Sequence, residues 1–293
     1  MKTVKERANA KINLYLDVLA KREDGFHEVK TVMHSVRFGD DITVGVEPAK
    51  ETSVTLSVVG NRFLPTDGRN LAVRAARLFL ERAGLCATVN IKMIKRIPVA
   101  AGLAGGSSDA AAVLRALNKL YGRLFSHSAL NAIAAELGSD IVYCLYGRCA
   151  LCEGRGEIMT KIKASLNAYA VIAIANERVS TPTAYRALDG LYRDFDGSVV
   201  SGGEEKYKRL YAALLENRLD TDSLFNIFEG AVLPTCEGAS KARARLIEQG
   251  ASAAMMSGSG PSVFGIFHTA EGAKKACLTL RTEGFRAYYA ALV

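Results

Sequence analysis

The sequence predicts an α+β protein built from two domains. Segments that alternate apolar and polar residues, as half-buried strands do, are interspersed with segments that carry helix start and stop signals. A loop of small residues connects one predicted strand to an alanine-rich helix. With 293 residues, 49% of them hydrophobic and 23% charged, the chain has the length for two cores and the composition of a soluble globular protein. We expect one domain over residues 1–160 and a second over 161–293.

The first half of the chain carries strong local signals. Alternation over residues 10–18 predicts a strand that presents Lys11 and Asn13 on the same face. Asn70 and Gly84 are a good N-cap and a good C′ residue, so they predict a helix between them. The other expected elements are a tight turn at Asp24-Gly25, strands over 41–46, 54–59 and 87–94, and a helix from Ser126 to Leu137.

The second half begins with an apolar strand over residues 168–175 and then becomes largely helical. Ser180 followed by Pro182 predicts a helix start. Residues 189–205 are polar and contain glycine, which predicts a mobile surface loop. The remaining expected elements are helices over 204–217, 222–229, 240–249 and 271–283 and strands over 263–267 and 287–293.

The run from Pro98 to Asp109 is the most informative segment. Its small residues let the backbone approach an anion, the hydroxyls of Ser107 and Ser108 add donors, and the first helical turn presents N–H groups. These features predict a phosphate-binding loop. It has neither the Walker A nor the Rossmann spacing, and ordinary tight packing of small residues is the alternative interpretation.

Three separated segments together predict phosphoryl transfer. This reaction needs a phosphate cradle, a cation for developing charge and a group that acts on the attacking hydroxyl. The small-residue loop supplies the cradle, Lys11 the cation and Asp140 the base, and a second such loop spans Ser257–Gly260. Taken singly, these could be a solvated strand lysine, a capping aspartate and a plain turn.

The net charge and the cysteine content limit the classes of ligand and partner that the sequence suggests. The net charge of +8 suits an anionic partner, which could be a nucleotide, a phosphorylated metabolite or RNA, but the basic residues are interleaved with acids. Cys149 and Cys152 have metal-ligand spacing without a second ligand pair, so we expect reduced thiols and no direct metal ligands. The chain has no apolar run of membrane-spanning length and no signal-like N-terminus, which predicts a cytoplasmic protein with no membrane partner.

Three motifs resemble those of the GHMP kinases: Ala10-Lys11-Ile12-Asn13 with Asp24–His27, then Pro98–Ala110, then Ser257–Gly260. The resemblance covers nearly the whole chain. It extends to residues 70–76, 137–140, 154–157 and 225–229. It implies an N-terminal, ATP-binding domain like domain 2 of ribosomal protein S5, followed by an α/β C-terminal domain.

The Lys11 and Asp24–His27 motifs resemble most closely the family members that act on cytidine diphosphate-linked alcohols. They imply ATP-dependent phosphorylation of a small alcohol that carries cytidine diphosphate, in isoprenoid precursor synthesis. Mevalonate, homoserine or a sugar is an alternative acceptor. A non-catalytic protein of this fold that binds anions or RNA is the alternative of a different class. The resemblance favours no nucleic-acid partner and leaves both a monomer and a homodimer open.

The resemblance also implies roles for individual residues. Asp140 is the general base, and Lys11 polarises the hydroxyl and stabilises transition-state charge. Asn13 orients the substrate, and His27 bonds the cytosine edge. Aromatic rings at Phe26 and Tyr185 stack on the cytosine ring.

ATP and Mg²⁺ are the implied cofactors. ATP lies against Asn70 and Lys95, and Mg²⁺ uses the substrate phosphates and typically keeps several waters, which leaves direct protein ligands open. The loop that holds the triphosphate comprises Pro98, Val99, Ala100, Ala101, Gly102, Leu103, Ala104, Gly105, Gly106, Ser107 and Ser108. The far side of the phosphate site is closed by Ser257, Gly258, Ser259 and Gly260.

Some positions depart from the family pattern. Ala100 and Ala104 replace glycines of the common central motif, so we expect ordinary backbone angles at both. Phe26 replaces a tyrosine, Ile227 an aspartate and Val142 a proline.

Overall fold

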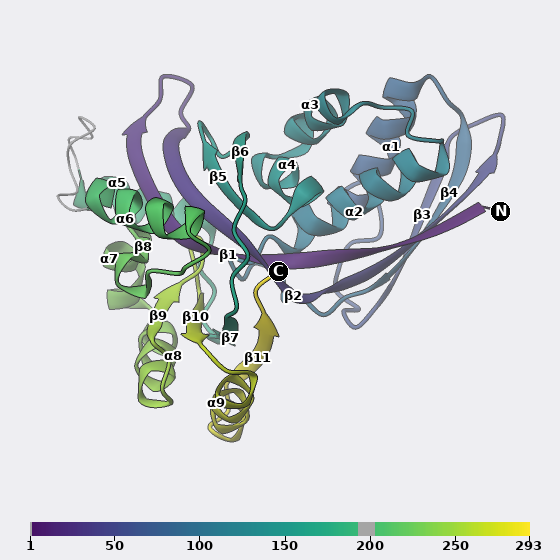
Figure 1. Cartoon of the computed structure of the whole chain (residues 1–293). Coiled ribbons are helices and arrows are strands. Elements are labelled where there is room, and N and C mark those ends of the chain that lie inside the picture. Colours follow the sequence, from purple (N-terminus) through teal and green to yellow (C-terminus); the bar gives the residue numbers. More distant parts are fainter. Residues whose placement is uncertain (1, 193–202) are drawn as a thin grey trace. The chain divides into compact units, whose positions relative to one another are not determined.

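The computed structural model describes residues 2–192 and 203–293 (Figure 1). The chain divides into two compact units, each assembled from separated stretches of sequence. The first contains residues 2–10, 39–99 and 104–147; the second contains 11–38, 100–103 and the described residues from 148 onward. The division into domains at residue 160 stays a prediction. No helix in the described ranges is long and apolar enough to cross a membrane.

The first unit combines a sheet with helices. β4 (Ala87–Ile94) runs parallel to β3 (Ser53–Val59) and antiparallel to the second part of β2 (His27–Pro48). Asn70 accepts a hydrogen bond from Ala72 N at 2.9 Å, and Gly84 ends the helix with a φ of 63°, which confirms the predicted helix. The helices are α1 (Leu71–Ala83), α2 (Gly105–Leu120), α3 (His127–Leu137) and α4 (Ser139–Tyr146), and α1 lies beside α2 (Figure 1).

The second unit contains strands of two sheets. In one, β1 (Lys2–Lys21) runs parallel to β8 (Phe225–Asn226), and β2 pairs with β5 (Cys149–Glu153), which pairs with β6 (Ile158–Ile162). The other has the order β11–β7–β10–β9 with antiparallel neighbours, which is the order of a split βαβ fold. Its strands are β7 (Tyr169–Ile174), β9 (Ala253–Met256), β10 (Ser262–Phe267) and β11 (Arg286–Ala291).

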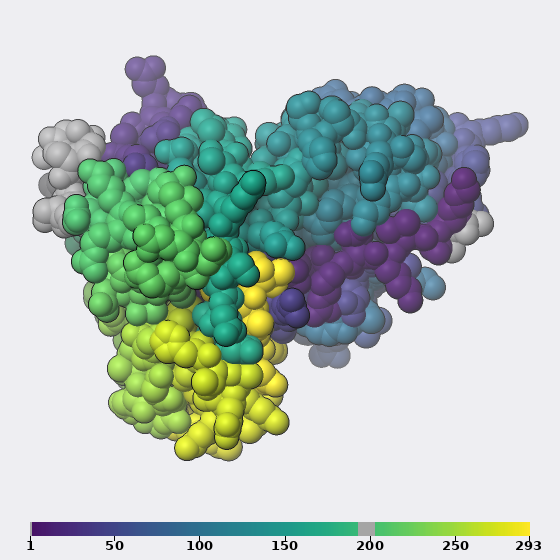
Figure 2. Space-filling model, in the orientation of Figure 1, coloured from purple at the N-terminus to yellow at the C-terminus, as the bar shows by residue number. Residues whose placement is uncertain are grey.

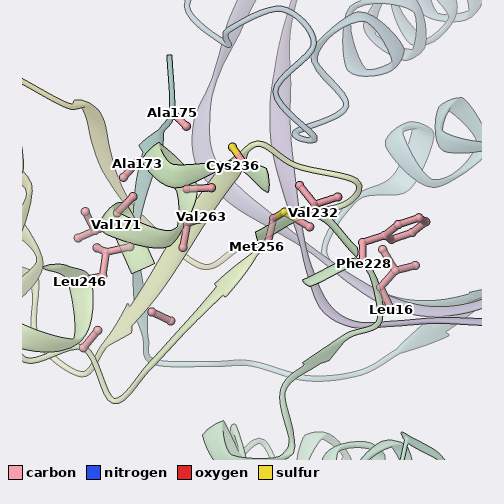
Figure 3. Packing of buried hydrophobic residues seen from close by; sticks show 14 of the residues in the cluster. Leu16, Val171, Ala173, Ala175, Phe228, Val232, Cys236, Leu246, Met256 and Val263 are labelled. Carbon is pink, nitrogen blue, oxygen red and sulfur yellow. The ribbon is translucent and has the colours of Figure 1, made fainter. Parts of the chain in front are cut away.

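The described part of the second unit also contains α-helices. They are α5 (Thr181–Leu191), α6 (Gly203–Leu215), α7 (Phe228–Val232), α8 (Glu237–Glu248) and α9 (Ala270–Thr282). Both α8 and α9 contact β7 and β10, and in Figure 2 the yellow residues of α9 and β11 form a continuous surface. Figure 3 shows Val171 and Ala173 of β7, Val263 of β10 and Leu246 of α8 in one hydrophobic cluster. The connection between β9 and β10 is therefore fixed at both ends by core strands.

The structure corrects the predicted helix over residues 222–229. That segment forms a 3₁₀ turn at Thr221–Ser223, the short strand β8 and the start of α7. Phe225 and Asn226 pair with Tyr15 and Leu16 of β1, and this tertiary pairing overrides the local helical pattern.

Other predicted bounds also change. The strand predicted over 10–18 is the middle of the longer β1, and α4, β5 and β6 were not predicted. Of the loop predicted over 189–205, residues 189–191 end α5 and 203–205 begin α6, while 193–202 lie outside the described residues.

Candidate active site

Lys11 is a buried lysine with a fixed ammonium group. Its residue is 4% exposed, and its Nζ donates to Asn13 Oδ1 at 2.7 Å and to the carbonyl of Gly102 at 3.0 Å. The bond between residues two apart confirms that Lys11 and Asn13 share a strand face. Asn13 Nδ2 donates to Thr31 Oγ1 at 2.8 Å, which in turn donates to the carbonyl of Tyr15 at 2.6 Å. Lys11 is therefore held in one orientation by hydrogen bonds to Asn13 of β1 and to the loop, and Asn13 is itself bonded to Thr31 of β2.

The third motif packs directly on this lysine. Ser257 Oγ donates to the Gly102 carbonyl at 3.1 Å, so the same oxygen accepts from Ser257 and Lys11. A Cβ at Gly102, where φ is 71°, would stand 2.2 Å from the Ser257 carbonyl oxygen. A Cβ at Gly258 would lie 3.3 Å from Lys11 Nζ. Only glycine fits at position 102, because both the positive φ and the close approach exclude a side chain.

The expectation of ordinary backbone angles at Ala100 and Ala104 is wrong. Their φ angles are 53° and 55°, in the left-handed region. An L-residue pays roughly 1–2 kcal/mol for this conformation, but one residue at a time can adopt it when its surroundings hold it there. Ala104 is the N-cap of α2, so the loop keeps the shape of a glycine loop with alanine in its place.

The start of α2 has the features of a phosphate cradle. Its N-cap Ala104 provides no side-chain hydrogen bond, so the first N–H groups of the helix are not capped by that residue. A Cβ at Gly105 would lie 2.9 Å from Ile97 Cγ2, which requires glycine there. Ser108 is buried and its hydroxyl donates to the Gly105 carbonyl at 3.0 Å, whereas Ser107 is half-buried. Ser107 is therefore the better placed of the two hydroxyls.

The flanks of the loop differ in exposure. Pro98 is half-buried, Val99 is exposed, and Ala101 and Leu103 are buried. Gly106 is exposed. The Leu103 carbonyl accepts from Lys11 N at 3.2 Å, which fastens the loop to β1.

Lys95 is enclosed by the carboxyl groups of two aspartates of the first unit. Its Nζ lies 2.6 Å from Asp40 Oδ2 and 2.6 Å from Asp109 Oδ2, and no side chain of the three is more than 3% exposed. Burial raises the pKa of Asp109 to about 8, against the opposing attraction of Lys95. The ammonium of Lys95 is therefore bonded to side chains within the protein. Through Asp109 it connects the residue that follows β4 to α2.

Asn70 also uses its side chain within the protein. Its Oδ1 caps α1 and its Nδ2 donates to the Pro65 carbonyl at 2.8 Å. Contact of Asn70 and Lys95 with ATP stays a prediction.

Asp140 lies in the first turn of α4 and is half-buried. It belongs to the first unit and Lys11 to the second, so their pairing as base and cation stays a prediction.

His27 stands in an ordered polar and aromatic cluster. Its Nε2 lies 2.7 Å from Asp189 Oδ1, and its ring stacks on Tyr185 with centroids 4.6 Å apart. Burial raises the pKa of Asp189, but hydrogen bonds from Lys21 and His27 outweigh it, so that this pKa lies below its usual value. Tyr185 thus stacks on the imidazole of His27 itself, and its stacking on a cytosine ring stays a prediction.

Phe26 is separate from that stack. It is 54% exposed on the turn, with the guanidinium of Arg155 at 4.9 Å from its ring centroid. The turn itself forms as predicted: Gly25 has a φ of 82° and donates to the Arg22 carbonyl at 3.1 Å. Stacking of Phe26 on a ligand stays a prediction.

Comparisons with known proteins match both halves of the chain. The model of the GHMP kinases N terminal domain matches residues 70–148, and that of the GHMP kinases C terminal matches 205–286. A relative from Gloeobacter violaceus named 4-diphosphocytidyl-2-C-methyl-D-erythritol kinase is 40% identical over 286 residues, 97% of this chain and 92% of its own. This chain belongs to the GHMP kinase family. A Bacillus subtilis relative of the same name is 40% identical over 264 residues, 89% of this chain and 87% of its own.

Solved structures agree with this membership. A crystal structure of 4-(cytidine 5'-diphospho)-2C-methyl-D-erythritol kinase matches with a TM-score of 0.79 and 34% identity, covering 99% of each chain. Homoserine kinase from Cytophaga hutchinsonii matches with a TM-score of 0.78 over 100% of this chain and 95% of its own. At 21% identity, the homoserine kinase shows a shared fold alone.

Sequence reasoning missed several polar residues of this GHMP kinase. Asp189 holds His27, while Asp40 and Asp109 hold Lys95. Of these, only Asp109 had a signal in the sequence, because it directly follows the two serines of the loop. Ile227, where the family pattern has aspartate, is buried in the hydrophobic cluster, and Val142 is buried in α4.

Proposed function

We propose that this GHMP kinase transfers the γ-phosphoryl group of ATP to the 2-hydroxyl of 4-diphosphocytidyl-2-C-methyl-D-erythritol, a step in isoprenoid precursor synthesis by the non-mevalonate route. The observation that carries the proposal is 40% identity to relatives of that name over nearly the whole chain. The fixed, buried ammonium of Lys11 supports it, because phosphoryl transfer is catalysed mainly by positioning and by charge stabilisation.

In this proposal Lys11 and Asp140 act on the attacking hydroxyl. Asp140 accepts the proton as the oxygen attacks phosphorus, and the ammonium of Lys11 stabilises the negative charge that develops. Asn13 supports both the substrate and the ammonium, since its Oδ1 accepts from Lys11 Nζ at 2.7 Å. Replacing Lys11 with alanine lowers turnover more than it weakens binding, because the charge acts mainly in the transition state.

ATP binds with its phosphates along residues 98–108 and against Ser257–Gly260. The small residues and the helix N-terminus fit a triphosphate, and Ser107 and the backbone of Gly106 are the accessible donors. Within the described residues there is no group of three or more His, Cys, Asp or Glu side chains that could hold a metal. The proposal includes Mg²⁺, which, bound with ATP, would neutralise the charge of the phosphates.

The cytidine group binds beside His27, with Phe26 and Tyr185 as the candidate stacking residues. Asp189 orients the imidazole, which supports a directional contact with the base. The proposal includes ATP binding by residues 1–160 and a second domain over 161–293. It further includes a cytoplasmic location, a monomer or homodimer, and no nucleic-acid partner.

The experiment is ADP release from Mg·ATP with the cytidine compound, mevalonate and homoserine offered in parallel. Turnover with the cytidine compound alone supports the proposal. Turnover with mevalonate or homoserine instead supports a kinase but rejects the proposed substrate. A folded protein that is inactive with all three compounds favours the alternative of a non-catalytic binding protein.

A pair of histidine variants tests the cytidine site. His27→Ala raises KM for the cytidine compound about tenfold, the effect of about 1.4 kcal/mol. His127→Ala is the matched control, because His127 also stacks on a tyrosine, Tyr146, with centroids 5.5 Å apart, and has no proposed role. An unchanged KM in the His27 variant rejects recognition of cytosine by His27.

A further inference from the structure

We infer that Asn226 is a positioning residue that sets the loop of residues 256–260 against Gly102 and Lys11. The inference rests on the proposed kinase function, in which Lys11 stabilises transition-state charge. Asn226 belongs to the segment Phe225–Glu229, which the sequence resemblance includes but to which no role is attached.

The carboxamide of Asn226 is saturated by backbone groups. The residue is 5% exposed, and its Nδ2 donates to the carbonyls of Met256 at 2.7 Å and Gly258 at 2.9 Å. Its Oδ1 accepts from Phe228 N at 3.0 Å. A carboxamide has two N–H donors, and here both hold carbonyls that flank Ser257. Among the standard side chains only asparagine and glutamine carry this planar group, and glutamine carries it one methylene further from the backbone.

Asn226 is itself anchored on the strand that carries Lys11. It pairs with Leu16 in the parallel register of β8 and β1, and Ile227 N donates to the Leu16 carbonyl at 3.0 Å. Leu16, Phe228 and Met256 belong to the hydrophobic cluster drawn in Figure 3. The anchor is therefore rigid, and Asn226 transmits the position of β1 to the loop.

Glu229 adds a third bond to the same loop. Its Oε1 accepts from Met256 N at 2.9 Å. Burial raises the pKa of Glu229, against the opposing effects of that hydrogen bond and of Arg243. Asn226 and Glu229 together hold the N–H and carbonyl of Met256 and the carbonyl of Gly258.

The loop so held determines the surroundings of the Lys11 ammonium. Ser257 Oγ and Lys11 Nζ donate to the same carbonyl of Gly102, at 3.1 and 3.0 Å. The Cα hydrogens of Gly258 face this pair, because a Cβ there would lie 3.1 Å from the Gly102 oxygen. A displacement of the loop thus moves the acceptor of Lys11 and crowds its ammonium. Asn226 acts on phosphoryl transfer through Lys11 without touching the substrate.

The principal variant is Asn226→Asp. The carboxylate keeps the size of the amide and can still accept from Phe228 N, but its oxygen repels the carbonyls of Met256 and Gly258. We expect kcat to fall about tenfold to a hundredfold, the effect of a misplacement near 1 Å, while KM for the cytidine compound changes less than about twofold. Asn226→Ser, which buries no charge, gives a smaller fall in kcat and serves if the aspartate variant does not fold.

The matched control is Asn118→Asp. Asn118 also bridges a backbone segment through its carboxamide, with Nδ2 donating to the Phe125 carbonyl at 3.0 Å and Oδ1 accepting from Phe125 N at 2.9 Å. Replacing Asn118 with aspartate lowers the stability of the protein. It leaves kcat within about twofold of the wild-type value when the assay is run below the unfolding transition. An equal fall in kcat for both aspartate variants overturns the inference.

Amide hydrogen exchange separates this inference from the proposed function. Asn226→Asp and Asn226→Ser accelerate exchange at the N–H groups of Met256, Ser257 and Gly260, and leave β11 unchanged. Hydrogen exchange is measured without turnover. An inactive wild-type protein would therefore reject the proposed function, whereas its exchange rates would still test whether Asn226 anchors the loop. Unchanged exchange at these three residues, or unchanged kcat in an active protein, overturns the inference.

Discussion

Replacing Lys95 with methionine is expected to lower the free energy of unfolding by about 3–5 kcal/mol, the cost of removing one partner from a buried ion pair. The Lys95 ammonium lies 2.6 Å from a carboxylate oxygen of both Asp40 and Asp109, and all three side chains are at most 3% exposed. Methionine fills a similar volume, so the cost comes from the uncompensated charge of Asp40. The other oxygen of Asp40 accepts from the N–H groups of Arg96 and Ile97, which hold that carboxylate in place.

Asp109→Asn is expected to cost much less, about 1 kcal/mol. Burial raises the pKa of Asp109 to about 8, so at neutral pH the folded protein holds it protonated beside the Lys95–Asp40 pair. An asparagine then resembles the native state. Between about pH 4 and pH 8 Asp109 holds its proton in the folded protein and not in the unfolded chain, so its contribution to stability falls as pH rises, and the asparagine variant lacks this contribution.

The assay is guanidinium unfolding followed by circular dichroism at pH 5 and pH 8. Arg82→Met is the control, because it breaks the exposed ion pair of Arg82 with Glu136, an effect of about 0–1 kcal/mol. Destabilisation by Lys95→Met no greater than that of Arg82→Met would refute the reasoning. An equal cost for Asp109→Asn and Lys95→Met would refute the protonation assigned to Asp109.

Three further outcomes are expected. Asp140→Asn lowers kcat about 10²- to 10⁴-fold, the contribution of a general base, with ADP affinity unchanged by calorimetry; unaltered turnover removes Asp140 from that role. Burial lowers the pKa of His34 to about 4, so protonation of His34 opposes folding, and the contribution of His34 to stability falls by about 3 kcal/mol as pH drops from about 6.5 to 4. His34→Leu removes this contribution, so the free energy of unfolding of the variant relative to the wild type rises by about 3 kcal/mol between about pH 6.5 and pH 4, and a difference that stays constant with pH would contradict the assignment. Ala104→Gly relieves a positive φ and raises the free energy of unfolding by about 1 kcal/mol, whereas a decrease would show that the alanine methyl contributes packing.

The parts of the fold that the sequence predicted are those whose signals are local. The helix between Asn70 and Gly84 has both its caps within the segment, and the shared face of Lys11 and Asn13 follows from strand periodicity alone. The helix predicted over 222–229 failed because pairing of β8 with β1, more than 200 positions away, decides that segment. The sequence located the third motif by its small residues. It did not predict that Asn226 anchors this motif, because the backbone carbonyls to which Asn226 donates lie about 30 residues further along the chain.

The left-handed positions of the central loop differ in how strongly they require glycine. Ala100, Gly102 and Ala104 all have positive φ angles, so each pays a similar conformational cost when it carries a side chain. At Gly102 a Cβ would in addition overlap the Ser257 carbonyl, a collision with backbone that no rotamer can relieve. Because the Gly102 carbonyl is also the acceptor of Lys11, shifting the loop to make room would displace the ammonium. The alanines therefore stand at the two positions where the conformational cost can be borne, and glycine stands where the loop meets the lysine.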